Sequence, residues 1–222
     1  FVKFTQAGHM KMETAGSLRD GKEIWGLAKL ADDFELAGGD EVKGYLLINQ
    51  PHAAGKAMTI KFTPIRVVCN NTLTMALQGE GTALRMPPVK EFDADVRAAA
   101  EEALGLSSQA IADFKEKADF LASRQFKHES VLNYIAELYQ PQILVDKAKS
   151  ITDEEFVMQE KFNATATQVL QNIDLSPGAT MKSAKGTWWG ALNGVTYLED
   201  HQRRATAVGN ALHSSWFGAG AN

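Results

Sequence analysis

The feature that most constrains the fold is a change in the period of the hydrophobic pattern near residue 93. Before it, apolar and polar residues alternate, as in strands that are half buried. After it, apolar residues recur at the spacing of amphipathic helices. The sequence therefore predicts an α+β protein with a twisted antiparallel β-sheet in the N-terminal part and a helical C-terminal half. We expect residues 1–92 to form a mainly β region with a short helix, and residues 93–222 a helical region packed on it as one composite domain.

Two hairpins are predicted in the β region. Asp20-Gly21 separates the alternating runs 9–15 and 22–30, and Asp-Gly is a strong hairpin signal because glycine accepts the positive φ of a tight turn. A second pair of strands is expected over 41–49 and 57–63, joined by a loop that contains proline and glycine.

The strand over 57–63 also predicts which side chains face the core. Its polar residues should be more exposed than its apolar ones, because successive side chains point to opposite faces of a sheet. The polar set is Thr59, Lys61 and Thr63, and the apolar set is Met58, Ile60 and Phe62. Pro64 should end or interrupt the strand.

Shorter elements are expected between this strand and residue 93. Asn70 or Asn71 can cap a short helix that carries Leu73, Ala76 and Leu77, and 89–92 can form a short strand. Five helices then follow, over 93–104, 107–124, 130–139, 152–173 and from 186 towards 213. Gly105 is expected to separate the first two of them.

Composition excludes several classes of protein. A hydrophobic content of 45% with a net charge of −4 is too apolar and too weakly charged for a disordered chain. No apolar run approaches the roughly 18 residues of a membrane-spanning helix. Cys69 is the only cysteine, so no intrachain disulfide can form, and we expect a buried structural thiol.

The net charge conceals a segregation along the chain. Residues 1–90 hold 11 basic and 9 acidic residues, residues 91–160 hold 7 and 15, and residues 161–222 hold 5 and 3. An acidic segment thus lies between two mildly basic ones. It can be a solvated helical face, or it can meet the basic segments of another subunit, which would favour a homo-oligomer.

No catalytic or cofactor-binding pattern is present. The five histidines lack the spacing of a helical metal site, and the chain has neither a phosphate-binding loop nor the Gly-x-Ser-x-Gly motif of hydrolases. The sequence therefore predicts a protein that is not an enzyme and that has no metal and no cofactor.

The segment 182–193 is the most informative for binding. Lys182 and Lys185 precede a predicted helix N-terminus, where free backbone N–H groups also favour anions. Trp188 and Trp189 can stack nucleobases, or they can be core residues. Because neighbouring residues on a helix point about 100° apart, one indole can be buried while the other is free.

Three runs carry a resemblance to a known family. Residues 13–22 followed by 25–30, residues 64–73 and residues 189–201 resemble, in the same order, a family of phage/plasmid-like proteins of unknown function. The segment 51–55 departs from it, since the relatives tend to carry His-Asp-Gly there. The resemblance implies a mobile DNA element and, for this chain, the host-cell cytoplasm.

The order of strands leading into a helix also resembles the core of phage single-strand annealing proteins. That resemblance implies a homo-oligomeric ring or helix that holds single-stranded DNA and pairs complementary strands without ATP. The expected contacts are Lys56, Lys61, Arg66, Lys182, Lys185 and Arg203 with phosphate, and Trp188 or Trp189 with bases. The alternatives are a non-enzymatic phage interaction or assembly protein and, third, a nuclease that uses Asp or Glu to hold Mg²⁺.

Overall fold

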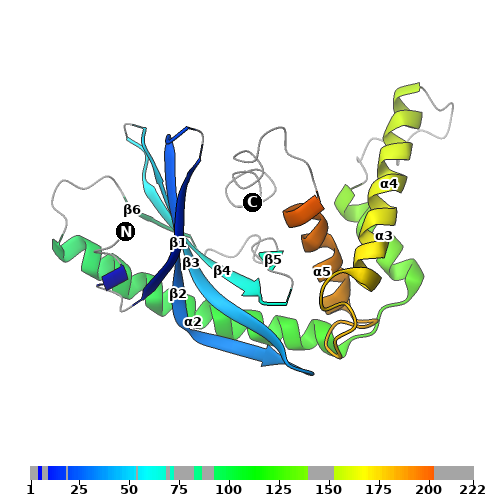
Figure 1. Cartoon of the computed structure of the whole chain (residues 1–222), viewed down its shortest axis with the longest axis horizontal. Coiled ribbons are helices and arrows are strands. Elements are labelled where there is room, and N and C mark those ends of the chain that lie inside the picture. The colour runs from blue at the N-terminus through cyan, green and yellow to red at the C-terminus, as the bar shows by residue number, and fades with distance from the viewer. Residues whose placement is uncertain are drawn as a thin grey trace.

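The computed structural model describes residues 5–6, 10–18, 20–53, 55–68, 71–72, 83–86, 93–139 and 153–202. The described strands precede all the described helices except a single turn at residues 5–6. Figure 1 shows a twisted antiparallel sheet at one side of the molecule and a group of helices at the other, with one long helix joining them. The predicted α+β class is confirmed.

The sheet is built mainly from a meander of four strands, in which three consecutive hairpins join each strand to the next. Its strands are β1 (Lys11–Leu18), β2 (Glu23–Leu36), β3 (Asp40–Pro51) and β4 (Met58–Arg66), which pair antiparallel in chain order. In the first turn Asp20 and Gly21 have φ values of 56° and 81°, as the Asp-Gly signal predicts. Both predicted hairpins are confirmed, although β2 extends to Leu36 rather than residue 30.

Two short strands line the far edge of β4. β5 (Asn71–Thr72) pairs with its last two residues, and β6 (Ala83–Met86) pairs with Met58–Lys61. Pro64 was expected to end or interrupt the strand, but β4 continues through it to Arg66. Among the described strands, nothing pairs with this edge between the β6 and β5 stretches, and a strand tolerates proline at such an edge position.

One long helix covers one face of the sheet. α2 (Asp93–Ser123) crosses beneath the strands in Figure 1 and continues beyond them. Gly105 lies within this helix, so the predicted break there is wrong. A single helical glycine costs only about 1 kcal/mol, which the packing of α2 outweighs. Gly44 of β3 allows the close contact, because a Cβ there would lie 2.9 Å from Ile111 of α2.

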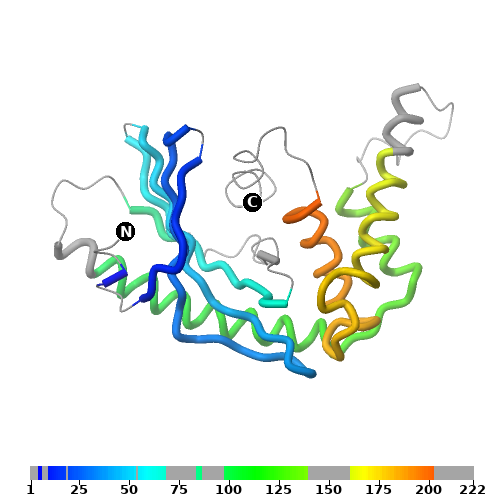
Figure 2. The backbone as a smooth tube through the Cα atoms, in the orientation of Figure 1, coloured from blue at the N-terminus to red at the C-terminus, as the bar shows by residue number. Residues whose placement is uncertain are grey.

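The remaining helices gather beyond the far end of α2. They are α3 (His128–Tyr139), α4 (Asp153–Leu175), α5 (Trp188–Tyr197) and the π-helical turn η3 (Leu198–Gln202). Figure 2 shows their backbones bundled together, away from the sheet. The predictions for α3 and α4 are confirmed within two residues. The short helix near residue 73, the strand over 89–92, and the helix beyond residue 202 lie outside the described residues.

The core has a large and a small part. The large cluster joins the α2 side of the sheet to α2 and includes Trp189 of α5. The small cluster holds α3, α4 and α5 together, where Gly194 of α5 lies so close to Ile173 of α4 that a Cβ would meet it at 2.6 Å. Because Trp189 belongs to the large cluster and its helix to the small one, α5 connects the two halves of the molecule.

Candidate nucleic-acid interface

The sheet has a second face, opposite α2, and this face carries the candidate site. Paired residues in neighbouring strands point to the same side, so the register defines its members. The second face includes Glu23, Trp25, Leu27 and Lys29 of β2, Tyr45, Leu47 and Asn49 of β3, Thr59, Lys61 and Thr63 of β4, and Arg85 of β6. The strand ends at the β1–β2 and β3–β4 connections are called the loop end of the sheet below.

Lys61 and Arg85 place two positive charges side by side on this face. Arg85 lies opposite Thr59, two residues from Lys61 on β4, so the two cations are diagonal neighbours on adjacent strands. Lys61 is half buried and Arg85 is exposed. Burial lowers the pKa of Lys61, and the positive charge of Arg85 lowers it further. An anion placed between the two side chains would relieve their repulsion.

Further cations surround this pair at the loop end. Lys22 and Lys56 are exposed in the two connections, which are held together by a hydrogen bond of 2.7 Å from the His52 N–H to the Lys22 carbonyl. Two acidic residues lie at this end among the described residues: Asp20 is exposed in the first connection, and Glu23, the first residue of β2, is buried. The loop end is therefore predominantly basic within the described residues, although the protein as a whole is acidic.

An aromatic ring lies in the same row of cross-strand partners as Arg85 on the second face. Trp25 is half buried and lies over Gly16 of β1, where a Cβ would come within 3.0 Å of the indole. The row continues through Asn49 and Thr59 to Arg85. Strands lie about 4.8 Å apart, so the indole and the arginine are separated by about 14 Å across the sheet.

The centre of the second face is apolar and buried. Leu27, Tyr45 and Leu47 form a cluster there, and Thr63 beside them is only 1% exposed. Burial, and then the hydrogen bond to Glu13, raise the pKa of the Tyr45 hydroxyl to about 12. The predicted alternation is confirmed where Ile60 and Phe62 are buried and Thr59 and Lys61 are partly exposed. The alternation is wrong for Thr63, because the cluster of Leu27, Tyr45 and Leu47 buries it.

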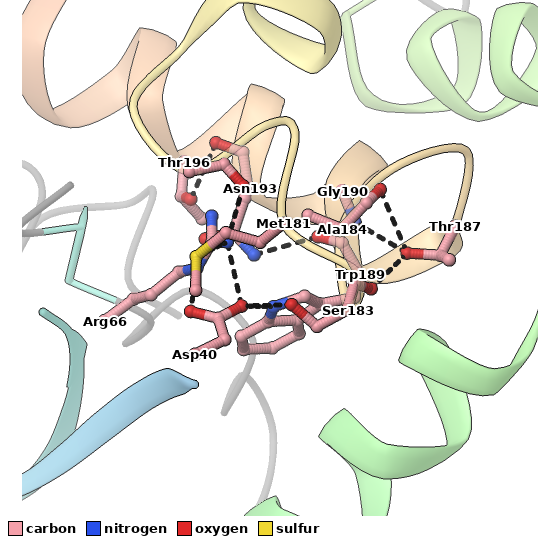
Figure 3. A network of polar contacts seen from close by, with 11 residues as sticks. Asp40, Arg66, Met181, Ser183, Ala184, Thr187, Trp189, Gly190, Asn193 and Thr196 are labelled. Atoms are coloured by element: carbon pink, nitrogen blue, oxygen red, sulfur yellow. Dashed lines mark hydrogen bonds and ion pairs between the residues drawn. The ribbon is translucent and has the colours of Figure 1, made fainter. Parts of the chain in front are cut away.

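The opposite end of the sheet holds a buried polar network, which Figure 3 shows. Arg66, the last residue of β4, donates two hydrogen bonds to the Asp40 carboxylate, at 2.7 and 2.8 Å. The carboxylate also accepts hydrogen bonds from the Ser183 hydroxyl and from the Trp189 indole N–H, at 2.5 and 2.9 Å. Burial alone would raise the pKa of Asp40, but these donors and the guanidinium charge together lower it below 3.8.

This network corrects two of the predicted contacts. Arg66 is 1% exposed and its guanidinium faces Asp40 and the Gly178 carbonyl, so it cannot reach a phosphate at the surface. Trp189 is fully buried and packs edge-on against Phe114 of α2. Arg66 joins the sheet to the segment that precedes α5, and Trp189 joins α5 itself to Asp40 of the sheet and to α2.

The other predicted contacts fall into two separate places. Lys56 and Lys61 lie at the loop end, whereas Lys182 and Lys185 are exposed in the segment before α5, where Lys182 lies against Gly38 of the β2–β3 turn. β3 has twelve residues, and at about 3.3 Å per residue its ends lie about 40 Å apart. Trp188 is half buried between Phe126 and Tyr134, and Arg203 lies outside the described residues.

Sequence reasoning missed Arg85. Its strand has only four residues and is followed at once by two prolines, so no strand was expected there. The signal was the alternation of Leu84, Arg85 and Met86, in which Met86 faces the core and Arg85 does not.

The described residues contain no group of three or more side chains able to hold a metal ion. Within the same residues, no helix combines the length and apolar character that a membrane span requires. The geometry defines an α+β protein with an antiparallel sheet. One face of this sheet packs on a helix, and the other face is basic at its loop end.

Comparison with protein-family models identifies the family of the chain. It belongs to the family described as a domain of unknown function, DUF932, which matches residues 1–216. No curated protein and no solved structure matches it.

Proposed function

We propose that the protein is a phage- or plasmid-encoded factor that binds single-stranded DNA at the loop end of the second face and promotes the pairing of complementary strands without ATP. The observation that carries the proposal is the placement of Lys61 and Arg85 side by side, in reach of one phosphate backbone. Lys22 and Lys56 extend the same basic surface around the two connections.

The chemistry of this surface suits a single strand better than a duplex. Cations hold phosphates without regard to sequence, and an aromatic ring provides a stacking platform for any base. Trp25 and Arg85 lie about 14 Å apart in one row, so a strand that crosses the sheet can contact both. Asn49 and Thr59 lie between them in the same row.

Contacts of this type also suit annealing. Phosphate and stacking contacts position a strand but do not read its sequence, so the hydrogen-bonding edges of its bases can pair with a second strand. A homo-oligomer would present several such surfaces in a row, which is the arrangement implied by the resemblance to annealing proteins.

The test uses the full chain with labelled oligonucleotides, without ATP or metal. Gel shifts measure binding, and the rate of duplex formation from complementary strands measures annealing. Binding together with faster annealing supports the proposal. Degradation that appears only when Mg²⁺ is added to a parallel reaction would favour the nuclease, and inertness in both reactions would favour an interaction or assembly protein.

A pair of matched variants locates the binding surface. Lys61→Glu with Arg85→Glu reverses two charges on the second face, and Lys127→Glu with Lys161→Glu reverses two exposed charges in the helical half. Both double variants change the net charge equally. We expect only the first to lose binding, and equal losses would show that total charge, not this surface, governs the interaction.

A further inference from the structure

A groove between α2 and α5 remains outside the proposed interface. It encloses about 650 Å³ and has an apolar floor, formed by Phe114 and Leu121 of α2 with Leu192 of α5. Phe120 at its margin is 57% exposed, an unusual exposure for a phenylalanine. A concave apolar surface with an exposed aromatic side chain is typical of a place where another polypeptide packs.

More acidic than basic side chains line the groove, and the Arg124 guanidinium lies over the Phe120 ring at its margin, 5.1 Å from the ring centre. Asp113 and Glu116 line it together with Lys117, and α2 as a whole carries seven acidic and three basic residues. A basic segment with an apolar side chain would therefore complement the groove.

Such a segment exists on the same chain. Leu175 at the end of α4 is 80% exposed, more than any other large hydrophobic residue of the described chain. The residues that follow it, 176–187, include Lys182 and Lys185 and contain no acidic residue. Both lysines are exposed.

The segment is held in a fixed conformation. The Ser183 hydroxyl donates to Asp40, and the Thr187 hydroxyl donates to the Ser183 carbonyl at 2.6 Å. Lys182 lies against the β2–β3 turn of its own chain. A preformed segment loses little conformational entropy when it binds, which favours association with another molecule.

We propose that the groove binds Leu175 and the basic segment 176–187 of a second copy of this chain. Leu175 packs on the apolar floor beside Phe120, and Lys182 and Lys185 lie against Asp113 and Glu116. This contact would explain the charge segregation along the chain, because the acidic segment of one copy would meet the basic segment of the next. It does not depend on nucleic-acid binding.

The first test is the mass of the full chain by light scattering over a range of protein concentrations. We expect an oligomer at micromolar concentration. Leu175→Asp and Phe120→Asp should each weaken its association about tenfold or more, because each places a charge in an apolar contact. Leu138→Asp changes an exposed leucine of α3 that lies outside the groove and should have no effect. Thermal melts of each variant confirm that it is folded.

Charge reversal with rescue is the sharper test. Lys182→Glu with Lys185→Glu should weaken association, and so should Asp113→Lys with Glu116→Lys. The four substitutions together should restore it, since the charges are again opposite. A wild-type monomer at all concentrations would overturn the proposal and leave the groove to another kind of occupant. Failure of the combined variant to recover, or an equal effect of Leu138→Asp, would overturn it as well.

Discussion

The two ends of the sheet use positive charge in opposite ways. Arg66 at one end is buried and bonded to a buried carboxylate, whereas Lys61 at the other is half buried beside another cation. Removing a charge from water costs several kcal/mol unless a partner compensates it. The Asp40 end therefore ties the fold together, whereas the loop end places two cations side by side near the surface, where an anionic ligand can bind.

The largest effect is expected from breaking the buried pair. Arg66→Met removes the guanidinium and leaves the Asp40 carboxylate in the core, with only Ser183 and Trp189 as donors. We expect a loss of about 3–5 kcal/mol in the free energy of unfolding, because an unpaired buried charge is strongly destabilising. Denaturant unfolding measures it. Lys61→Met, at the other end of the sheet, is the matched control and should cost much less.

The same network predicts a response to acid. The pKa of Asp40 is lower in the folded protein than its ordinary 3.8, so its ionisation stabilises the fold above that pH. This contribution is lost as the pH falls through the lowered value. Unfolding free energies measured at neutral and at acidic pH should differ less in Asp40→Asn than in the wild type. An unchanged acid dependence would show that other carboxylates dominate it.

Trp25 should affect binding where Trp189 affects stability. Trp25→Ala is expected to weaken the affinity for single-stranded DNA by about 1–3 kcal/mol, the usual value of one stacked base. Trp189→Ala should instead lower the melting temperature, because that indole is buried in the core and bonded to Asp40. Binding curves and thermal melts of both variants separate the two roles. A binding loss confined to Trp189→Ala would reverse the assignment.

A smaller effect is expected at Gly16, which underlies the Trp25 indole. A methyl group there would lie 3.0 Å from the ring and displace it by a few tenths of an ångström. Gly16→Ala should therefore weaken DNA binding in the same direction as Trp25→Ala, but by less. Gly105→Ala is the control, since a Cβ there meets nothing within 4 Å. Equal affinities of the two glycine variants would show that the indole position is unimportant.

The elements that depend on a local sequence pattern could be predicted from the sequence. Alternation and the Asp-Gly turn located the four main strands, and helical spacing located α3 and α4. Lys61 was expected on this strand and Lys56 in the connection before it, and both lie there; they are only five positions apart along the chain.

The roles of Arg66 and Trp189 depend on partners far away in sequence. Asp40 lies 26 residues before Arg66 and 149 before Trp189, so no local pattern reveals that it neutralises one and bonds to the other. In the sequence, an arginine at the end of a strand looks the same whether its side chain pairs with a buried carboxylate or is exposed to solvent. The position of Arg85 beside Lys61 likewise arises from strand pairing across a connection of more than fifteen residues.

The central claim is that the loop end of the second face binds single-stranded DNA, and the salt dependence of affinity tests it most directly. The affinities of wild type, Lys61→Gln with Arg85→Gln, and Lys127→Gln with Lys161→Gln are measured against salt concentration. Each lost phosphate contact removes about 0.7 from the slope of log affinity against log salt, so the first double variant should lose about 1.4 and the second none. No salt-sensitive affinity in the wild type, or equal slopes in all three proteins, would contradict the account.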